Sequence, residues 1–168
     1  MRLHVTLPVA GLVTGGRQGG ETQMSTTLVI GLDGQGSGDR AVAWGKRMAN
    51  MIADCELLIV YVIEWSPYSF QTAEENAERH KRREQEIATA TERVVNPAVA
   101  ALQEEGHAAR GMVRHGNVAD TLNNVAIENK AEQIIVARSS DGGLATRIFG
   151  SATANLVMSA SVPVTVVG

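Results

Sequence analysis

Short apolar runs separated by helical segments are the feature that most constrains the fold of this chain. Three of the runs are dense in Val, Ile and Leu, which is typical of strands buried on both faces of a parallel sheet. A fourth run alternates weakly, with Ala109, Gly111 and Val113 on one face. A fifth closes the chain, and its Pro163 stands near the start, where a strand tolerates proline. The expected strands cover residues 27–33, 55–65, 107–115, 132–138 and 162–168.

Segments with helical features lie between these strands. They cover residues 41–53, 73–105 and 115–130, and a last helix is expected to begin near Ser151. Asn117 is predicted to cap the third helix, with Asp120 at its third position in a variant of the capping box. Asn96-Pro97 is predicted to break or kink the long second helix, because proline disfavours a helical conformation in the residue before it.

This regular alternation of strands and helices predicts the fold class. It requires an α/β fold with an open, five-stranded, mostly parallel sheet and helices on both faces. Ligands of such sheets bind outside the carboxyl ends of the strands, where the strand order reverses. Three loops are therefore candidates for a site, and they begin at Asp33, Glu64 and Ala137.

We expect the chain to divide into a short leader and one domain. The 168 residues suit one domain, which we place at residues 25–168. Residues 1–24 are expected to be a disordered leader, or an upstream extension of a protein that begins at Met24; a signal peptide is the less favoured alternative, because no Ala-x-Ala cleavage site follows.

Charge and cysteine content narrow the partners and the compartment. A net charge of −3 disfavours a nucleic-acid surface, and no apolar run is long enough for a membrane span. Cys55 is the only cysteine, so it forms no intrachain disulfide and is expected to be a structural thiol. These features predict a cytoplasmic protein.

Two places carry residue types suited to ligand binding. Asp33, at the end of the first strand, can accept hydrogen bonds from a ribose or help to hold a divalent cation, although a turn or cap role before Gly34 is equally compatible with its position. Gly150-Ser151 opens the last helix, where free N–H groups and a hydroxyl suit a phosphate; an ordinary serine cap is the alternative. No GxSxG, HExxH or GxxxxGKS motif occurs, so spacing alone predicts no enzyme.

Three segments together resemble the universal stress proteins, in particular the single-domain bacterial type. They are VIGLDGQGSGDRAVAWGKRMA, HGNVADTLNNVAIENKAEQIIVA and GGLATRIFGSATANLVMSASVPVTVVG, and the resemblance covers about residues 27–168 in the order of the family. It implies a five-stranded parallel sheet, in agreement with the pattern above. It also implies a homodimer that pairs the last strands, here residues 163–167.

Many members of this family bind ATP through a motif of Gly, two residues, Gly, nine residues and then Gly-Ser or Gly-Thr. Alignment on Gly150 and Ser151 places the first two motif positions at Ala137 and Ser140, so the spacing is retained while two glycines are replaced. The resemblance implies that Gly150 and Ser151 contact phosphate, that Asp33 contacts the ribose or a metal such as Mg²⁺, and that Val62 lies beside the adenine. If both replacements strain the loop, a cost of about 2–3 kcal/mol would weaken binding about 30- to 150-fold.

Three functions remain open at this point. The first is a dimeric stress-response protein that binds ATP as a regulatory ligand, with the loop at 137–151 altering the surface shown to an unknown protein partner. The second is a dimeric interaction module that binds no nucleotide, which Ala137, Ser140 and Asp141 favour. The third is slow ATP hydrolysis, for which Asp33 with a bound metal is the only supporting feature.

Overall fold

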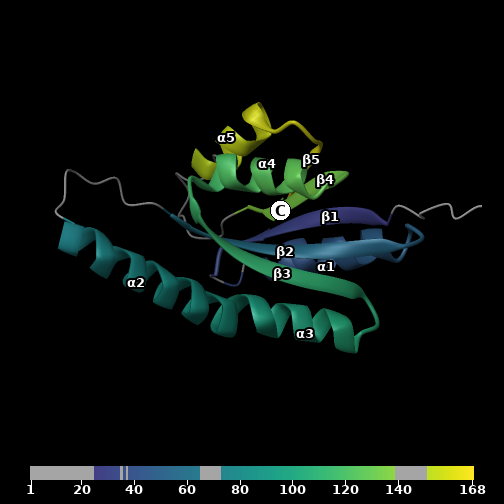
Figure 1. Ribbon diagram of the computed structural model, residues 1–168. Helices are drawn as coiled ribbons and strands as arrows, with labels where there is room; N and C mark the ends of the chain where they lie inside the picture. Colours follow the sequence, from purple (N-terminus) through teal and green to yellow (C-terminus); the bar gives the residue numbers. More distant parts are fainter. Residues whose placement is uncertain (1–24, 35, 37, 65–72, 139–150) are drawn as a thin grey trace, which may run out of the picture.

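A five-stranded parallel sheet forms the centre of the molecule (Figure 1). The computed structural model describes residues 25–34, 36, 38–64, 73–138 and 151–168. All four pairs of neighbouring strands are parallel, and the strand order is β3-β2-β1-β4-β5. The strands are β1 (Thr26–Leu32), β2 (Cys55–Glu64), β3 (Ala108–Gly116), β4 (Gln133–Ala137) and β5 (Val164–Val167). The predicted fold class is therefore confirmed.

Helices cover both faces of this sheet. They are α1 (Gly38–Ala49), α2 (Ala73–Ala90), a π-helical turn η1 (Thr91–Val95), α3 (Asn96–Glu104), α4 (Val118–Glu128) and α5 (Ser151–Ser159). Figure 1 shows α2 and α3 along one face, and α4 and α5 along the other. The side chains of α1 pack into the same apolar cluster as those of η1 and α3, so α1 belongs to the first of these faces.

The central strands are buried on both sides, which explains their continuous apolar character. Along β1, Leu28 and Ile30 pack against α1, η1 and α3, whereas Val29 between them packs against α4 and α5. The neighbouring positions Ile134 and Ile135 of β4 divide between the two clusters in the same way, and both are fully buried. A strand whose two faces are both covered has no place for alternating polar residues.

The order of the strands reverses at β1. From β1 the chain continues outward through β2 to β3, and then returns to the other side of β1 for β4 and β5. The helices that follow β1 and β4, α1 and α5, consequently pack on opposite faces, and such a reversal opens a crevice at the carboxyl ends of the strands. This is the place where the sequence predicts a ligand.

The long helix predicted over 73–105 is interrupted, but it does not end at Asn96. Asn96 keeps an α-helical conformation, and its N–H donates to the carbonyl of Thr91, which is the spacing of a π-helix. Pro97 then lies in the first turn of α3, where its missing N–H costs little. The predicted interruption is therefore a widened turn and not a break. Because Pro97 lies in the first turn of α3, the helix needs no hydrogen bond from it.

Two local predictions are also confirmed by the structure. The side chain of Asn117 accepts a hydrogen bond from the N–H of Asp120 at 3.2 Å, as the capping pattern requires. Cys55 is half-buried at the first residue of β2, and burial raises the pKa of its thiol, which keeps it in the unreactive protonated form. None of the helices in the described ranges is long and apolar enough to cross a membrane.

Gly111 makes room for the π-helical turn on β3. A β-carbon built at Gly111 would lie far inside van der Waals contact with Cγ1 of Val95, and at 3.0 Å from Cγ2 of Val99. Val95 is itself only 1% exposed, so it has little freedom to move away. The close approach of η1 to the sheet therefore depends on the absence of a side chain at Gly111.

We expect Gly111→Ala to lower the free energy of unfolding by about 1–3 kcal/mol, the usual cost of forcing an extra carbon into a packed core. Urea denaturation followed by circular dichroism measures this change. In a Val95→Ala background the colliding methyl groups are gone, so Gly111→Ala should cost clearly less there. Equal costs in both backgrounds would show that Val95 is not the obstacle.

Candidate functional site

A cavity of about 460 Å³ opens at the carboxyl ends of β1, β2 and β4. We call it the strand-end cavity. The first residues of α4 and α5 complete its wall, so five separate elements contribute to it. Its volume lies within the range of about 300–1,000 Å³ that is typical of small-molecule sites. It lies at the reversal of strand order, as the α/β pattern predicts.

The inner wall of the strand-end cavity is apolar. Val62, Leu122 and Val136 line it, and each is at most 8% exposed. Gly31 lies between two of them, because a β-carbon there would be 3.1 Å from both Cδ1 of Leu122 and Cγ1 of Val136. Such a wall suits the face of a flat apolar group rather than a charged one.

Polar side chains lie at the mouth of the strand-end cavity. Asp33 follows β1, Glu64 ends β2, and Thr153 stands in the first turn of α5. The two carboxylates accept hydrogen bonds from hydroxyl or amino groups and repel an anion. An anionic group is therefore favoured only on the opposite side of the mouth, near α5.

Asp33 has a structural contact of its own. Its Oδ1 accepts a hydrogen bond of 3.3 Å from the N–H of Gly38, the first residue of α1. Gly34 follows in the left-handed region (φ +72°), and a β-carbon on it would be 3.0 Å from Cε2 of Tyr61. The cap or turn role that the sequence left open for Asp33 is thus present, and the same carboxylate lines the cavity.

Val62 is the residue for which the resemblance implies a contact with adenine. It is 8% exposed, belongs to the apolar cluster under α4 and α5, and lines the strand-end cavity. Its neighbours Tyr61 and Ile63 pack into the cluster on the opposite face, as alternation along a strand requires. The structure therefore brings Asp33 and Val62 to one cavity.

The amino end of α5 supplies the third part of the mouth. Ser151 is the exposed first residue of the helix, and the next two residues, Ala152 and Thr153, line the cavity. The first N–H groups of a helix have no partner within it and carry a partial positive charge. Gly150, Ser140 and Asp141 lie outside the described residues.

Ala137 is the last residue of β4 and lines the strand-end cavity. It is paired in parallel register with Val167. Among the described residues, only Asp54 and Lys130 combine a side chain with positive φ. A glycine-only backbone conformation is therefore not required at Ala137, whose methyl group packs against the apolar cluster on the face covered by α1.

Several contributors to the site were not found from the sequence. Thr153 was missed because nothing in the local pattern separates it from ordinary helix residues, and Glu64 was named only as the start of a candidate loop. Arg40 of α1, which the sequence analysis did not single out, is not a lining residue of the cavity, but its Nη2 donates a hydrogen bond to the carbonyl of Arg138, just after β4. This contact joins two segments that are distant in sequence and brings a cation to the end of β4.

The described residues offer little support for a protein-bound metal. No group of three or more His, Cys, Asp or Glu side chains within the described ranges is placed to hold one. Asp33 already accepts a backbone N–H, so Mg²⁺ at this carboxylate would need most of its oxygen ligands from water or from a bound phosphate.

We expect Asp33→Ala to lower the free energy of unfolding by about 1 kcal/mol in nucleotide-free protein, because α1 loses an acceptor at its first turn. Asp33→Asn keeps an oxygen acceptor and should cost less. Urea denaturation of protein refolded without nucleotide measures both. An unchanged stability of Asp33→Ala would show that the carboxylate does not hold α1.

Comparisons with known proteins agree with this fold. Residues 24–168 match the model of the universal stress protein family. Among solved structures, the chain is similar to universal stress protein UspA from Lactobacillus plantarum, at 17% identity and a TM-score of 0.69, over 85% of this chain and 97% of that one. No curated protein matches the chain.

Two further similar structures contain nucleotides. One is a universal stress protein in complex with cAMP (23% identity, TM-score 0.54, 85% of this chain and 96% of that one). The other is the universal stress protein from Archaeoglobus fulgidus in complex with dAMP (16% identity, TM-score 0.55, 86% and 98%). The family model covers most of the chain, and the structure has the five-stranded parallel sheet that the resemblance implies. This chain belongs to the universal stress protein family.

Proposed function

We propose that this protein is a cytoplasmic stress-response protein that binds an adenine nucleotide, ATP first among them, in the strand-end cavity. The observation that carries the proposal is the cavity itself. Its inner wall is apolar, and the amino end of α5 lies at its mouth. The complexes of two similar proteins with cAMP and dAMP support an adenine nucleotide as the ligand class.

The chemistry of the walls suggests how the nucleotide would be oriented. The adenine ring fits the apolar wall beside Val62, where main-chain groups at the end of β2 can pair with its polar edge. The ribose hydroxyls suit the carboxylate of Asp33, which accepts hydrogen bonds. The phosphates suit the first turn of α5, with Gly150 and Ser151, because helix amino ends favour anions.

The replacement of glycine by alanine at position 137 is compatible with this proposal. Its strand conformation avoids the strain that a residue with a β-carbon would suffer in the left-handed region, so the remaining cost is the space that one methyl group occupies. Affinity then falls less than the 30- to 150-fold expected if both replaced glycines were strained. Binding would change the surface that residues 137–151 present to a protein partner.

Nucleotide carried through purification is the first test. We expect protein that is denatured after rapid purification to release an adenine nucleotide in near-stoichiometric amount, as measured by chromatography with mass detection. By calorimetry, Ser151→Ala should weaken ATP binding about tenfold to a hundredfold, the effect of one hydrogen bond to a charged group. Ser159→Ala, in the last turn of the same helix, is the matched control and should bind like the wild type.

Two outcomes would redirect this proposal. Empty protein that also gives no heat with millimolar ATP and Mg²⁺ would favour the ligand-free interaction module. Steady phosphate release that is lost in Asp33→Asn would favour slow hydrolysis instead. Titration with cAMP and dAMP in the same experiment distinguishes ATP from other adenine nucleotides.

We also propose that two copies pair through β5. The strand lies at an edge of the sheet. The N–H of Ile134 donates to Pro163 and that of Arg138 donates to Val167, so the peptide groups of Val164 and Val166 face away from β4. Val157 and Met158 of α5 are 51% and 89% exposed and offer apolar surface for the same association.

Val166→Pro removes an outward N–H without touching the hydrogen bonds to β4, and we expect it to shift the protein from dimer to monomer. Val166→Thr keeps the N–H and nearly the same shape, so it should remain dimeric. Sedimentation equilibrium at micromolar concentration measures both. If Val166→Pro stays dimeric while its circular dichroism is unchanged, the copies associate elsewhere.

A further inference from the structure

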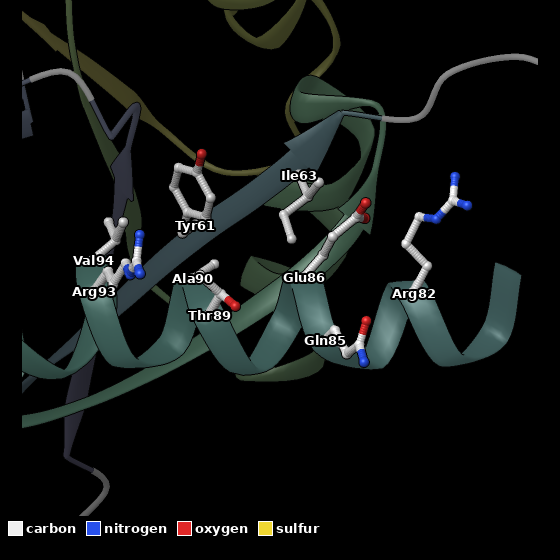
Figure 2. A pocket seen from close by; sticks show the side chains of 9 residues that line it. All are labelled: Tyr61, Ile63, Arg82, Gln85, Glu86, Thr89, Ala90, Arg93 and Val94. Carbon is white, nitrogen blue, oxygen red and sulfur yellow. The ribbon is translucent and has the colours of Figure 1, made fainter. Parts of the chain in front are cut away.

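A second cavity, of about 440 Å³, lies on the face of the sheet covered by α2 (Figure 2). We call it the α2 cavity. One wall is the carboxyl half of β2, through Tyr61 and Ile63, and the other is the last turns of α2 together with η1. Tyr61 and Ile63 also line the strand-end cavity, whereas the helical wall is new.

The floor of the α2 cavity is apolar. Tyr61 and Ile63 of β2 form one side of it, and Ala90 and Val94 of the helical segment form the other (Figure 2). Ala90 is almost fully buried and carries a side chain too small to fill the space in front of the tyrosine ring. A flat or branched hydrocarbon group is the natural occupant of such a floor.

Two arginines stand at the rim of the α2 cavity. Arg82 and Arg93 belong to one continuous helical segment and lie about 16 Å apart along its axis. Figure 2 shows Arg93 beside Val94 and Tyr61, and Arg82 beyond the end of the apolar floor. Within the described part of the chain, neither guanidinium makes an ion pair or a hydrogen bond.

Glu86 limits the kind of anion that fits. It lines the cavity between the two arginines, and its Oε2 is 3.7 Å from Nε2 of His115. A carboxylate at this place repels a group that carries several negative charges. The cation available to a ligand that also contacts the apolar floor is therefore Arg93.

Arg93 and Val94 owe their position to the π-helical turn. Both belong to η1, where the widened turn changes the direction of the side chains that follow α2. The turn is held against the sheet only because Gly111 leaves room for Val95. Single π-helical turns are frequent at functional sites, which is a second reason to consider this wall a binding surface.

We propose that the α2 cavity binds a small amphipathic monocarboxylate with a flat or branched apolar body. The carboxylate is bound by the planar guanidinium of Arg93, which can donate two parallel hydrogen bonds. The apolar body lies on Tyr61 and Ile63 and fills the space in front of Ala90. The volume of the α2 cavity suits a molecule of this size. A triphosphate is disfavoured, because only one cation is accessible and Glu86 lies beside it. This site is separate from the proposed nucleotide site.

The probe for this proposal is 2-naphthoate, with the neutral 2-naphthalenemethanol as its uncharged counterpart. We expect calorimetry on the full chain to show naphthoate binding that Arg93→Gln weakens about threefold to tenfold, the effect of one partly exposed charged hydrogen bond. Lys81→Gln removes the same charge from the same helix outside both cavities, and it should change the affinity less than about twofold. The neutral alcohol should be insensitive to Arg93→Gln.

Two filling variants identify the cavity that is occupied. Thr89→Trp, in the wall of the α2 cavity, should abolish naphthoate binding and leave ATP titration unchanged. Thr153→Trp, in the strand-end cavity, should do the opposite. Loss of naphthoate binding in Thr153→Trp alone, equal effects of Arg93→Gln and Lys81→Gln, or no binding at millimolar probe would each overturn the proposal. Circular dichroism and urea denaturation establish that each variant is folded.

Discussion

The burial of both faces of β1 and β4 is the constraint on which the rest of the structure depends. Neighbouring residues such as Ile134 and Ile135 point in opposite directions, and both are fully excluded from water. Helices must therefore cover both faces, and parallel strands can be joined only by crossovers that place them there. The crossover after β3 carries the chain back to the other side of β1. The crevice that becomes the strand-end cavity is a consequence of this reversal.

Features that depend on local sequence were predicted well. The strands follow from continuous apolar runs, and the cap at Asn117 follows from residue types a few positions apart. The local sequence did not predict the π-helical turn, although Pro97 indicated an interruption of the helix. Its form depends on Val95 meeting Gly111, which lie in separate elements and come together only through the packing of η1 on β3. No local pattern contains that contact.

The residues of the candidate site likewise divide into those that the sequence analysis named and those that it did not. Asp33 was singled out because it stands at the end of an apolar run, and Val62 because the resemblance implies it; both line the strand-end cavity, where the ends of parallel strands meet. Arg40 and Thr153 were not found, since α1 and α5 bring them to this edge from segments whose own patterns indicate only helices. The sequence also left two roles open for Asp33. The structure gives it a contact with Gly38 and a place in the cavity, so structural and binding roles are not exclusive.

Tyr61 connects the two proposed binding sites. Tyr61 is a lining residue of both cavities, and its ring packs beside Gly34, whose left-handed backbone follows directly on Asp33. An occupant of the α2 cavity lies on this ring, so any reorientation of the ring that binding requires also reaches the loop after β1. Linkage is reciprocal: a carboxylate that changes the affinity for nucleotide must have its own affinity changed by the same factor. Coupling between the two proposed ligands would therefore pass through the ring of Tyr61 and through Gly34, where a β-carbon would press against that ring.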